Sequence, residues 1–222
     1  MSQVTKIKSI EHLTHDVLHV SLEKPAGLNY ISGQAVDISL NKPEWKDKKN
    51  CFTFTSLPED DDIEFVIKTY PEHHGVTNEL LSAKPGDEIL LYDPFGDIHF
   101  KGDGIFIAGG AGITPFIPIL KDLENQNKVN GNKLIFANKA KEDIILEDHF
   151  RSLLGENFIN VLSGEDLDGY EHGYISAELI QKQKSDDLKY YYLCGPKPMM
   201  EAVEGHLKTL GITEEFVVKG GF

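Results

Sequence analysis

The first hundred residues alternate between apolar and polar positions, with the two-residue period of half-buried β-strands. This alternation predicts six strands, at residues 4–10, 17–22, 35–40, 51–56, 63–69 and 88–91. Turn-forming residues separate them, at 25–27, 32–33, 60–62 and 85–86, and a short helix is predicted at 77–83. Several short strands at this spacing are typical of an antiparallel β-barrel.

After residue 102 the pattern changes to strands that alternate with amphipathic helices. Strands are predicted at 104–110, 133–138, 158–162, 190–195 and 214–219, and helices at 114–126, 146–154, 175–183 and 198–211. Such alternation is typical of an α/β fold with a doubly wound parallel sheet. The sequence therefore predicts two domains, a barrel at residues 1–101 and an α/β domain at 102–222.

Two turns at strand ends carry the candidate chemistry of the second domain. They are GGAGITP at residues 109–115 and CGP at 194–196, and both lie at the carboxyl edge of the predicted sheet, where such folds bind ligands. Glycines let the backbone approach a pyrophosphate, and a following helix N-terminus attracts anions.

Neither turn is specific when it is taken alone. GGAGITP can be only a tight strand–helix turn, and Cys194 can be a small buried hydrophobic residue. Pro115 stands where a GxGxxG fingerprint has its third glycine, and Asn138 and Lys139 end the second strand in place of an acid. A Rossmann site with a ribose-binding carboxylate is therefore poorly supported.

Composition limits the partners and the location. The chain of 222 residues has 36 acidic and 22 basic residues and a net charge of −14, which disfavours nucleic acid. Arg151 is the only arginine, so bound anions must be held by lysines, backbone N–H groups or hydroxyls. Two cysteines are too few for a disulfide framework. With no apolar leader or membrane-length run visible, the expectation is a cytoplasmic protein without membrane contact.

No metal site is predicted. His12, His15 and His19 have helix-like spacing, but their segment alternates as a strand, so they cannot share one helical face.

Four motifs in order resemble the ferredoxin–NADP⁺ reductase family, and more narrowly its stand-alone flavodoxin or ferredoxin reductase-like members. They are FTFTS, HGVTNEL, GGAGITP and CGPKPMM, and the resemblance covers residues 33–222. It implies a barrel that binds FAD, an α/β domain that binds NADH or NADPH, and hydride transfer from nicotinamide to flavin N5. The electron acceptor, a small molecule or a redox protein, is left open.

The resemblance also implies roles for individual residues. Phe52 would stack on the isoalloxazine, Thr53 would hydrogen-bond near N5, and Phe222 would cover the flavin. The implied catalytic residues are Thr53, Cys194 and Phe222. The implied cofactor-binding residues are Asn50, Cys51, Phe52, Thr53, Ile67, Lys68, Thr69, Gly75, Val76, Thr77, Gly109, Gly110, Gly112, Thr114, Pro115, Asn138, Lys139, Cys194, Gly195, Pro196 and Phe222.

Two positions depart from the family pattern. Asn50 stands where an arginine would grip the flavin pyrophosphate, and Gly220 stands where a glutamate is usual. Lys48, Lys49 or Lys68 can compensate for the arginine as point charges only. An alternative therefore stays open: a non-catalytic or weakly active flavin- or nucleotide-binding module of the same fold.

Overall fold

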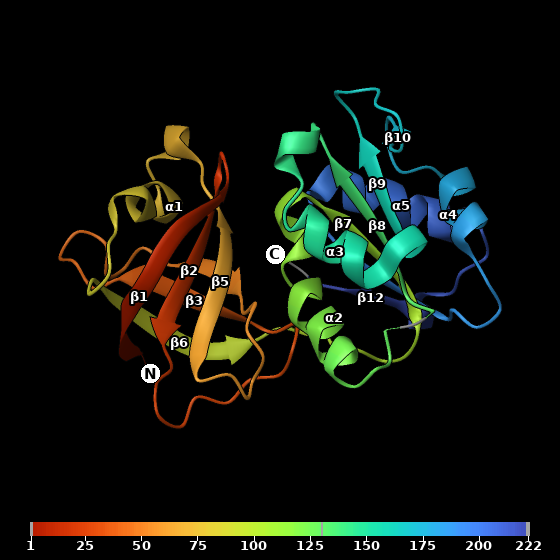
Figure 1. Ribbon diagram of the computed structural model, residues 1–222. Coiled ribbons are helices and arrows are strands. Elements are labelled where there is room, and N and C mark those ends of the chain that lie inside the picture. Colours follow the sequence, from red (N-terminus) through yellow and green to blue (C-terminus); the bar gives the residue numbers. More distant parts are fainter. Residues whose placement is uncertain (1, 130, 221–222) are drawn as a thin grey trace.

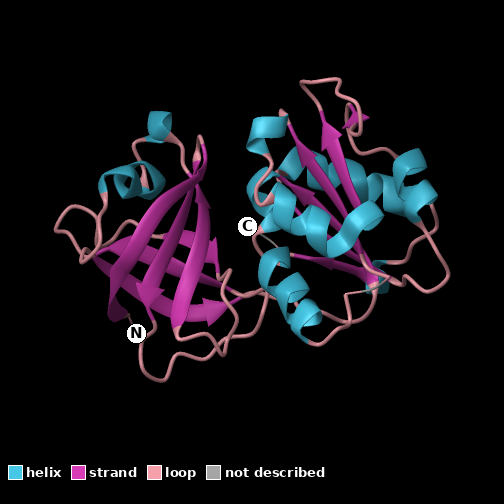
Figure 2. Ribbon diagram, viewed as in Figure 1, coloured by secondary structure: helices cyan, strands magenta, loops and turns pink. Residues whose placement is uncertain are grey.

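The computed structural model describes residues 2–129 and 131–220, in which two lobes lie side by side (Figure 1). The N-terminal lobe is built of strands, and the C-terminal lobe is a sheet with helices on both faces (Figure 2). Within the described residues, no helix has the length and apolar character needed to cross a membrane.

The N-terminal lobe is a six-stranded antiparallel sheet in the order β4-β3-β6-β1-β2-β5, which confirms the predicted antiparallel architecture. Its apolar side chains point inward and form one buried cluster. A short helix and two 3-10 helices lie between β5 and β6. The elements are β1 Gln3–Thr14, β2 Val17–Glu23, β3 Ala35–Leu40, β4 Asn50–Thr53, β5 Asp62–Lys68, η1 Pro71–His73, α1 Val76–Glu79, η2 Leu80–Ser82 and β6 Glu88–Phe95.

The strand predicted at 51–56 is shorter than expected, because β4 ends at Thr53, and the burial of this segment does not alternate: Thr53 and Thr55 are buried like Phe54. The reason is that the chain leaves β3 after Thr53 and turns toward β5, where the N–H of Thr55 donates to the carbonyl of Glu64 (2.8 Å). This contact closes the sheet toward a barrel and covers both faces of the segment.

The C-terminal lobe is a parallel sheet in the order β10-β9-β8-β7-β11-β12, as predicted for a doubly wound fold. Helices α2 and α3 pack on one face and α4 and α5 on the other. The helices and strands are β7 Gly104–Gly109, α2 Phe116–Asn125, β8 Lys133–Asn138, α3 Glu147–Leu154, β9 Phe158–Leu162, β10 Glu171–His172, α4 Ala177–Gln183, β11 Tyr190–Cys194, α5 Lys197–Thr209 and β12 Val217–Lys219. The 3-10 helices are η3 Gly110–Ile113, η4 Lys141–Asp143, η5 Gly155–Asn157 and η6 Glu214–Phe216.

Two expectations for this lobe need correction. The two-residue strand β10 was not predicted, because so short a segment has no readable period. The last strand begins at Val217 rather than at residue 214, because 214–216 form the 3-10 helix η6. The boundary between domains at residue 101 stays a prediction.

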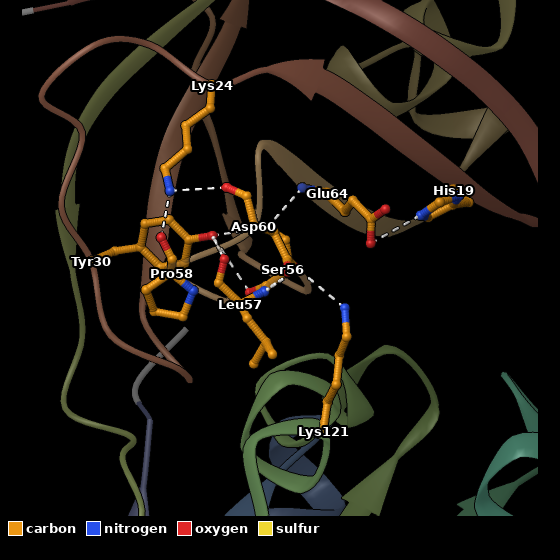
Figure 3. Close-up of polar contacts among 9 residues, drawn as sticks. All are labelled: His19, Lys24, Tyr30, Ser56, Leu57, Pro58, Asp60, Glu64 and Lys121. Carbon is orange, nitrogen blue, oxygen red and sulfur yellow. Dashed lines mark hydrogen bonds and ion pairs between the residues drawn. The ribbon is translucent and has the colours of Figure 1, made fainter. Parts of the chain in front are cut away.

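The lobes share an interface with an apolar centre and a polar edge. Val17 and Val66 of the barrel lie in the same buried cluster as Phe116 of α2. At the edge, Lys121 of α2 reaches Asp60 of the β4–β5 connection, with Nζ 3.1 Å from Oδ2 (Figure 3). The same Asp60 carboxylate oxygen accepts the N–H of Leu57 (2.8 Å). The backbone therefore orients the Asp60 side chain independently of Lys121.

Replacing Tyr192 by phenylalanine is expected to lower the free energy of unfolding by about 1–3 kcal/mol. The buried Tyr192 hydroxyl accepts the N–H groups of Lys101 (2.9 Å) and Gly102 (3.1 Å) and donates to the Gly102 carbonyl (2.6 Å). The variant leaves the N–H groups of Lys101 and Gly102 and the Gly102 carbonyl without the hydroxyl as a hydrogen-bond partner. Urea denaturation measures the change. Tyr191→Phe is the matched control on β11, because the Tyr191 hydroxyl has no hydrogen bond among the described residues; an equal loss in both variants would contradict the prediction.

Candidate functional site

The turns after β7 and β11 meet at the carboxyl edge of the sheet. A Cβ at Gly112 would lie 2.2 Å from the Cys194 carbonyl oxygen, and one at Gly109 would lie 2.5 Å from the Met199 sulfur. A Cβ at Gly195 would lie 2.6 Å from the Met199 methyl carbon. Gly112 is therefore required for the close packing of one turn on the other, because its neighbour is backbone, whereas a side chain at Gly109 or Gly195 would meet first the flexible Met199 side chain of α5.

Gly110 differs from those three glycines. It has a left-handed φ of 50°, and nothing lies within 4 Å of the position of its missing Cβ. Here the absent side chain leaves open space at the carboxyl edge of the sheet, as a site for a nucleotide requires. This is the feature of the first turn that fits the predicted dinucleotide.

The helix after the first turn begins later than the sequence suggests. The 3-10 helix η3 comes first, and α2 starts only at Phe116, directly after Pro115. The Thr114 hydroxyl donates to the Ala111 carbonyl (3.0 Å), so this predicted cofactor contact is held by its own turn. The backbone N–H groups available to an anion are those of the 3-10 turn rather than those of α2.

The barrel reaches the first glycine turn through β5, which contacts η3. Ile67 and Thr69 are buried, and the Thr69 N–H and hydroxyl both donate to the Asp16 carbonyl, at 2.7 and 2.9 Å. Lys68 Nζ lies 2.6 Å from Asp16 Oδ2. The Lys68 charge is therefore already paired, which makes it a poor substitute for the missing arginine.

The other two lysines near Asn50 have no acidic partner among the described residues. Lys48 Nζ lies 4.1 Å from the centre of the Trp45 ring, and Lys49 Nζ lies 3.6 Å from the centre of the Tyr92 ring. Both lysines are exposed, as is Asn50 itself. Two point charges therefore flank the position where the family has its arginine.

The predicted flavin residues on β4 and α1 lie on neighbouring parts of the barrel. Phe52 is half-buried, and the Thr53 hydroxyl makes no hydrogen bond among the described residues. Gly75 is the N-cap residue of α1, and no side chain accepts a hydrogen bond from the first turn of this helix. Its first N–H groups are therefore left for a ligand or water. An ion pair between Lys42 and Glu79 (2.6 Å) places the loop before β4 beside α1.

Asn138 and Lys139 follow the second parallel strand, as predicted. Lys139 is exposed, while Asn138 is buried and its Nδ2 has no hydrogen-bond partner among the described residues. Since buried amides are normally paired, this donor marks a polar position at the ligand edge of β8.

The two cysteines are expected to react slowly with thiol reagents in the folded protein. Burial, reinforced by the nearby Asp37 carboxylate, raises the pKa of Cys51 to about 11, and burial raises the pKa of Cys194 to about 12. Because only the thiolate attacks, both thiols are almost wholly unreactive at pH 8. Labelling with an aromatic disulfide at pH 8, with and without denaturant, measures this. Rapid native labelling would contradict it; Cys51→Ser and Cys194→Ser then show which thiol reacts.

A polar cleft of about 550 Å³, which the sequence analysis missed, lies beyond β8 at the same edge. Its lining residues are Lys141, Glu147, Asp148, Arg151, Asp168, Gly169 and Tyr170. They come from the loop after β8, the start of α3 and the loop after β9, three segments that no local motif connects.

A hydrogen-bonded carboxylate organises this cleft. Glu147 Oε1 accepts Arg151 Nη2 at 2.6 Å and the Tyr170 hydroxyl at 2.5 Å. Partial burial by itself would raise the pKa of Glu147, but these two hydrogen bonds outweigh it and lower the pKa. The charge of the only arginine is thus satisfied within the protein, while Asp148 and Asp168 have no ion-pair partner among the described residues.

Comparison with known proteins finds two family profiles. One, described as an FAD-binding domain, matches residues 2–115, and another, described as an oxidoreductase NAD-binding domain, matches residues 106–205. NADH-cytochrome b5 reductase 2 of Mycosarcoma maydis is 28% identical, with 90% of this chain and 63% of that protein covered. The toluate 1,2-dioxygenase electron transfer component of Pseudomonas putida is 26% identical, with 93% and 63% covered. The chain thus spans somewhat under two thirds of these relatives' length.

Solved structures share the two-lobed fold. The FAD/NAD-binding domain of nitric oxide dioxygenase from Vibrio cholerae superimposes with a TM-score of 0.86 at 20% identity, covering 99% of this chain and 98% of that one. A ferredoxin NADP⁺ reductase from Neisseria gonorrhoeae with bound FAD and NADP superimposes with a TM-score of 0.83 at 19% identity, covering 98% and 97%. Phe222, the predicted cover of the flavin, lies outside the described residues.

Proposed function

The chain belongs to the ferredoxin–NADP⁺ reductase-like family of FAD- and NAD-binding oxidoreductases, and we propose that it transfers a hydride from a reduced nicotinamide nucleotide to FAD. One observation carries the proposal: the turn at Gly110 is open, and it lies in η3, which β5 of the barrel contacts, so the two domains adjoin at this turn. A hydride donor on one domain and an acceptor on the other can meet only where the two domains adjoin.

The residues present fit both cofactors. FAD, when bound, supplies a hydride acceptor that can release its electrons to a separate partner. Phe52 offers a half-buried aromatic face for the ring, and Thr53 offers a hydroxyl that makes no hydrogen bond within residues 2–129 and 131–220. The first N–H groups of α1, after Gly75, would hold phosphate.

On the nucleotide side the protein positions the ligand and excludes water. Cys194 and Thr114 are buried at the two turns, and the raised pKa of Cys194 keeps its thiol neutral. Neutral side chains suit hydride transfer, which needs close approach of two rings rather than a protein acid or base.

The adenosine half of the nucleotide is proposed to occupy the cleft beyond β8. In doubly wound sheets the dinucleotide crosses the switch point, here between β7 and β11, and its adenosine ribose lies by the second strand. The cleft at that position holds three carboxylates against Lys141 and an arginine already bonded to Glu147. Carboxylates accept hydrogen bonds from a ribose diol and repel a 2′-phosphate, so NADH is the proposed donor.

NADH is therefore expected to reduce the flavin at least about tenfold more efficiently than NADPH, a difference of about 1.4 kcal/mol. Replacing Asp168 by asparagine is expected to lower the ratio of NADH to NADPH efficiency. The efficiency with NADPH should rise, because the neutral amide does not repel the 2′-phosphate. Stopped-flow reduction at varied nucleotide concentration measures both ratios. Asp186→Asn, at an exposed acid outside the cleft, is the control; an unchanged ratio in Asp168→Asn would contradict the assignment.

The acceptor is proposed to be a small molecule or a redox protein that is not strongly acidic. The net charge of −14 repels a polyanionic partner at long range. The named relatives include a cytochrome b5 reductase and a dioxygenase electron transfer component, which supports a separate redox partner.

An absorption spectrum of the purified protein, recorded after addition of FAD and desalting, tests the proposed function. Retained flavin bands that bleach within seconds when NADH is added without oxygen are the expected result. Bands that persist with both NADH and NADPH would instead identify a flavin-binding module without turnover. Release of the flavin and mass spectrometry then distinguish FAD from FMN.

A further inference from the structure

Three potential metal ligands from both lobes converge where the turn between β1 and β2 meets η4. His15 and Asp16 form the turn between β1 and β2, and Asp143 ends η4 of the other lobe. His15 Nε2 lies 3.7 Å from Asp16 Oδ2 and 3.7 Å from Asp143 Oδ1. The three ligand atoms all lie within 4.8 Å of one another.

These distances do not describe ordinary hydrogen bonds. Charge-assisted N–H···O bonds measure about 2.7–2.9 Å, well below the 3.7 Å found on both sides of the ring. The His15 ring makes no hydrogen bond among the described residues, although two carboxylates face it. A tetrahedral Zn²⁺ with bonds of about 2.0–2.1 Å separates its ligands by about 3.3 Å, so a small inward movement would seat the ion.

Both carboxylates are oriented by other groups. Asp143 Oδ2 accepts the N–H of Ala140 at 3.0 Å, which leaves Oδ1 toward His15. Asp16 Oδ1 faces the Thr14 hydroxyl at 3.2 Å, which leaves Oδ2 toward His15 and Lys68. Such outer hydrogen bonds fix the aim of metal-binding carboxylates.

Charge and exposure also suit a cation. Two carboxylates and Lys68 leave one net negative charge beside the His15 imidazole, within a chain of net charge −14. The His15 side chain is 52% exposed, which gives an ion an entry path and a water ligand, while the Asp143 side chain is 15% exposed. The lysine shares Asp16 Oδ2 with the ion, because a carboxylate oxygen has more than one lone pair.

We propose that His15, Asp16 and Asp143 bind one Zn²⁺ ion, or a divalent cation of the same class, that joins the barrel to the α/β domain. Zinc is chosen because it combines one imidazole nitrogen with carboxylate oxygens at four-coordinate sites. None of its ligands is in the predicted cofactor set, and Asp16 contacts two members of that set, Lys68 and Thr69.

Competition between the FAD-loaded full chain and a fluorescent zinc indicator tests the proposal. We expect one equivalent of Zn²⁺ to bind, and His15→Ala and Asp143→Asn to weaken it by at least about tenfold, the lower limit for loss of a supporting group. His12→Ala on β1 and the double variant His73→Ala/His74→Ala are matched controls, because these histidines are exposed but lie outside the cluster. Both control variants are expected to bind Zn²⁺ with the affinity of the parent chain.

Thermal unfolding provides a second, independent measurement. Zinc should raise the unfolding midpoint of the parent chain and the controls, and should raise that of His15→Ala and Asp143→Asn by less, since an ion stabilises the folded state in proportion to its binding. Failure to bind an equivalent, binding that survives both cluster variants, or binding lost in a control variant would each overturn the proposal. Circular dichroism of the variants establishes that they are folded.

Discussion

Replacing Asn50 by arginine is expected to tighten FAD binding by about 10- to 150-fold, because a hydrogen bond to a charged group contributes about 1.5–3 kcal/mol. Asn50 is exposed at the first position of β4, so a longer side chain meets no packed core. Arginine presents two parallel N–H donors to a phosphate, which neither asparagine nor a neighbouring lysine can do. Titration of the apoprotein with FAD, monitored through the quenching of flavin fluorescence, measures the affinity.

Asn50→Lys and Lys49→Met separate charge from geometry. The lysine variant is expected to gain less than the arginine variant, since it adds a charge without the fork. Lys49→Met removes the ammonium group that lies over the Tyr92 ring. This variant is expected to bind FAD more weakly if Lys49 substitutes for the arginine. An arginine variant that binds FAD no better than the parent would show that the pyrophosphate does not lie beside Asn50.

Replacing Gly112 by alanine is expected to cost about 1–3 kcal/mol of folding free energy or more and to abolish nucleotide binding. Its Cβ would lie 2.2 Å from the Cys194 carbonyl oxygen and 2.6 Å from the Gly195 nitrogen. Both neighbours are backbone atoms at the end of β11, so the two turns must separate. Urea denaturation and NADH-dependent flavin reduction together measure the two effects.

Gly110→Ala and Gly205→Ala provide the contrast. At Gly110 the added methyl meets no atom but requires a φ of 50°, at a cost of about 1 kcal/mol, so binding should fall more than stability. Gly205 lies inside α5 with open space around it, and alanine there should stabilise the helix by about 1 kcal/mol. Equal stability losses at 110 and 112 would refute the packing role of Gly112.

Much of the fold follows from local periodicity. The strands Ala35–Leu40, Lys133–Asn138 and Phe158–Leu162 coincide with their predicted limits, because each is bounded by turn residues and carries an unbroken apolar pattern. The segment 51–56 departs from its predicted limits for a complementary reason. Its sequence alternates, but the contact of Thr55 with Glu64 of β5 covers both faces of the segment, and no pattern within the segment reveals that contact.

The candidate site divides in the same way. The glycine turns are visible in the sequence as motifs, yet which glycine packs and which leaves open space depends on Cys194 and Met199, far along the chain. From the sequence, any of Lys48, Lys49 and Lys68 can replace the charge of the arginine missing at position 50. The structure pairs Lys68 with Asp16 and leaves the other two lysines exposed.

The sequence by itself determined the two-domain order, the strand and helix periods and the turns that can approach a nucleotide, because these are properties of neighbouring residues. Only the tertiary structure decided which distant side chains meet. It brought Glu147 to Tyr170 in the carboxylate-lined cleft, and His15 to Asp143 across the two lobes. Such pairs depend on how loops from separate strands fold over one sheet edge or one domain interface, and no local pattern records that geometry.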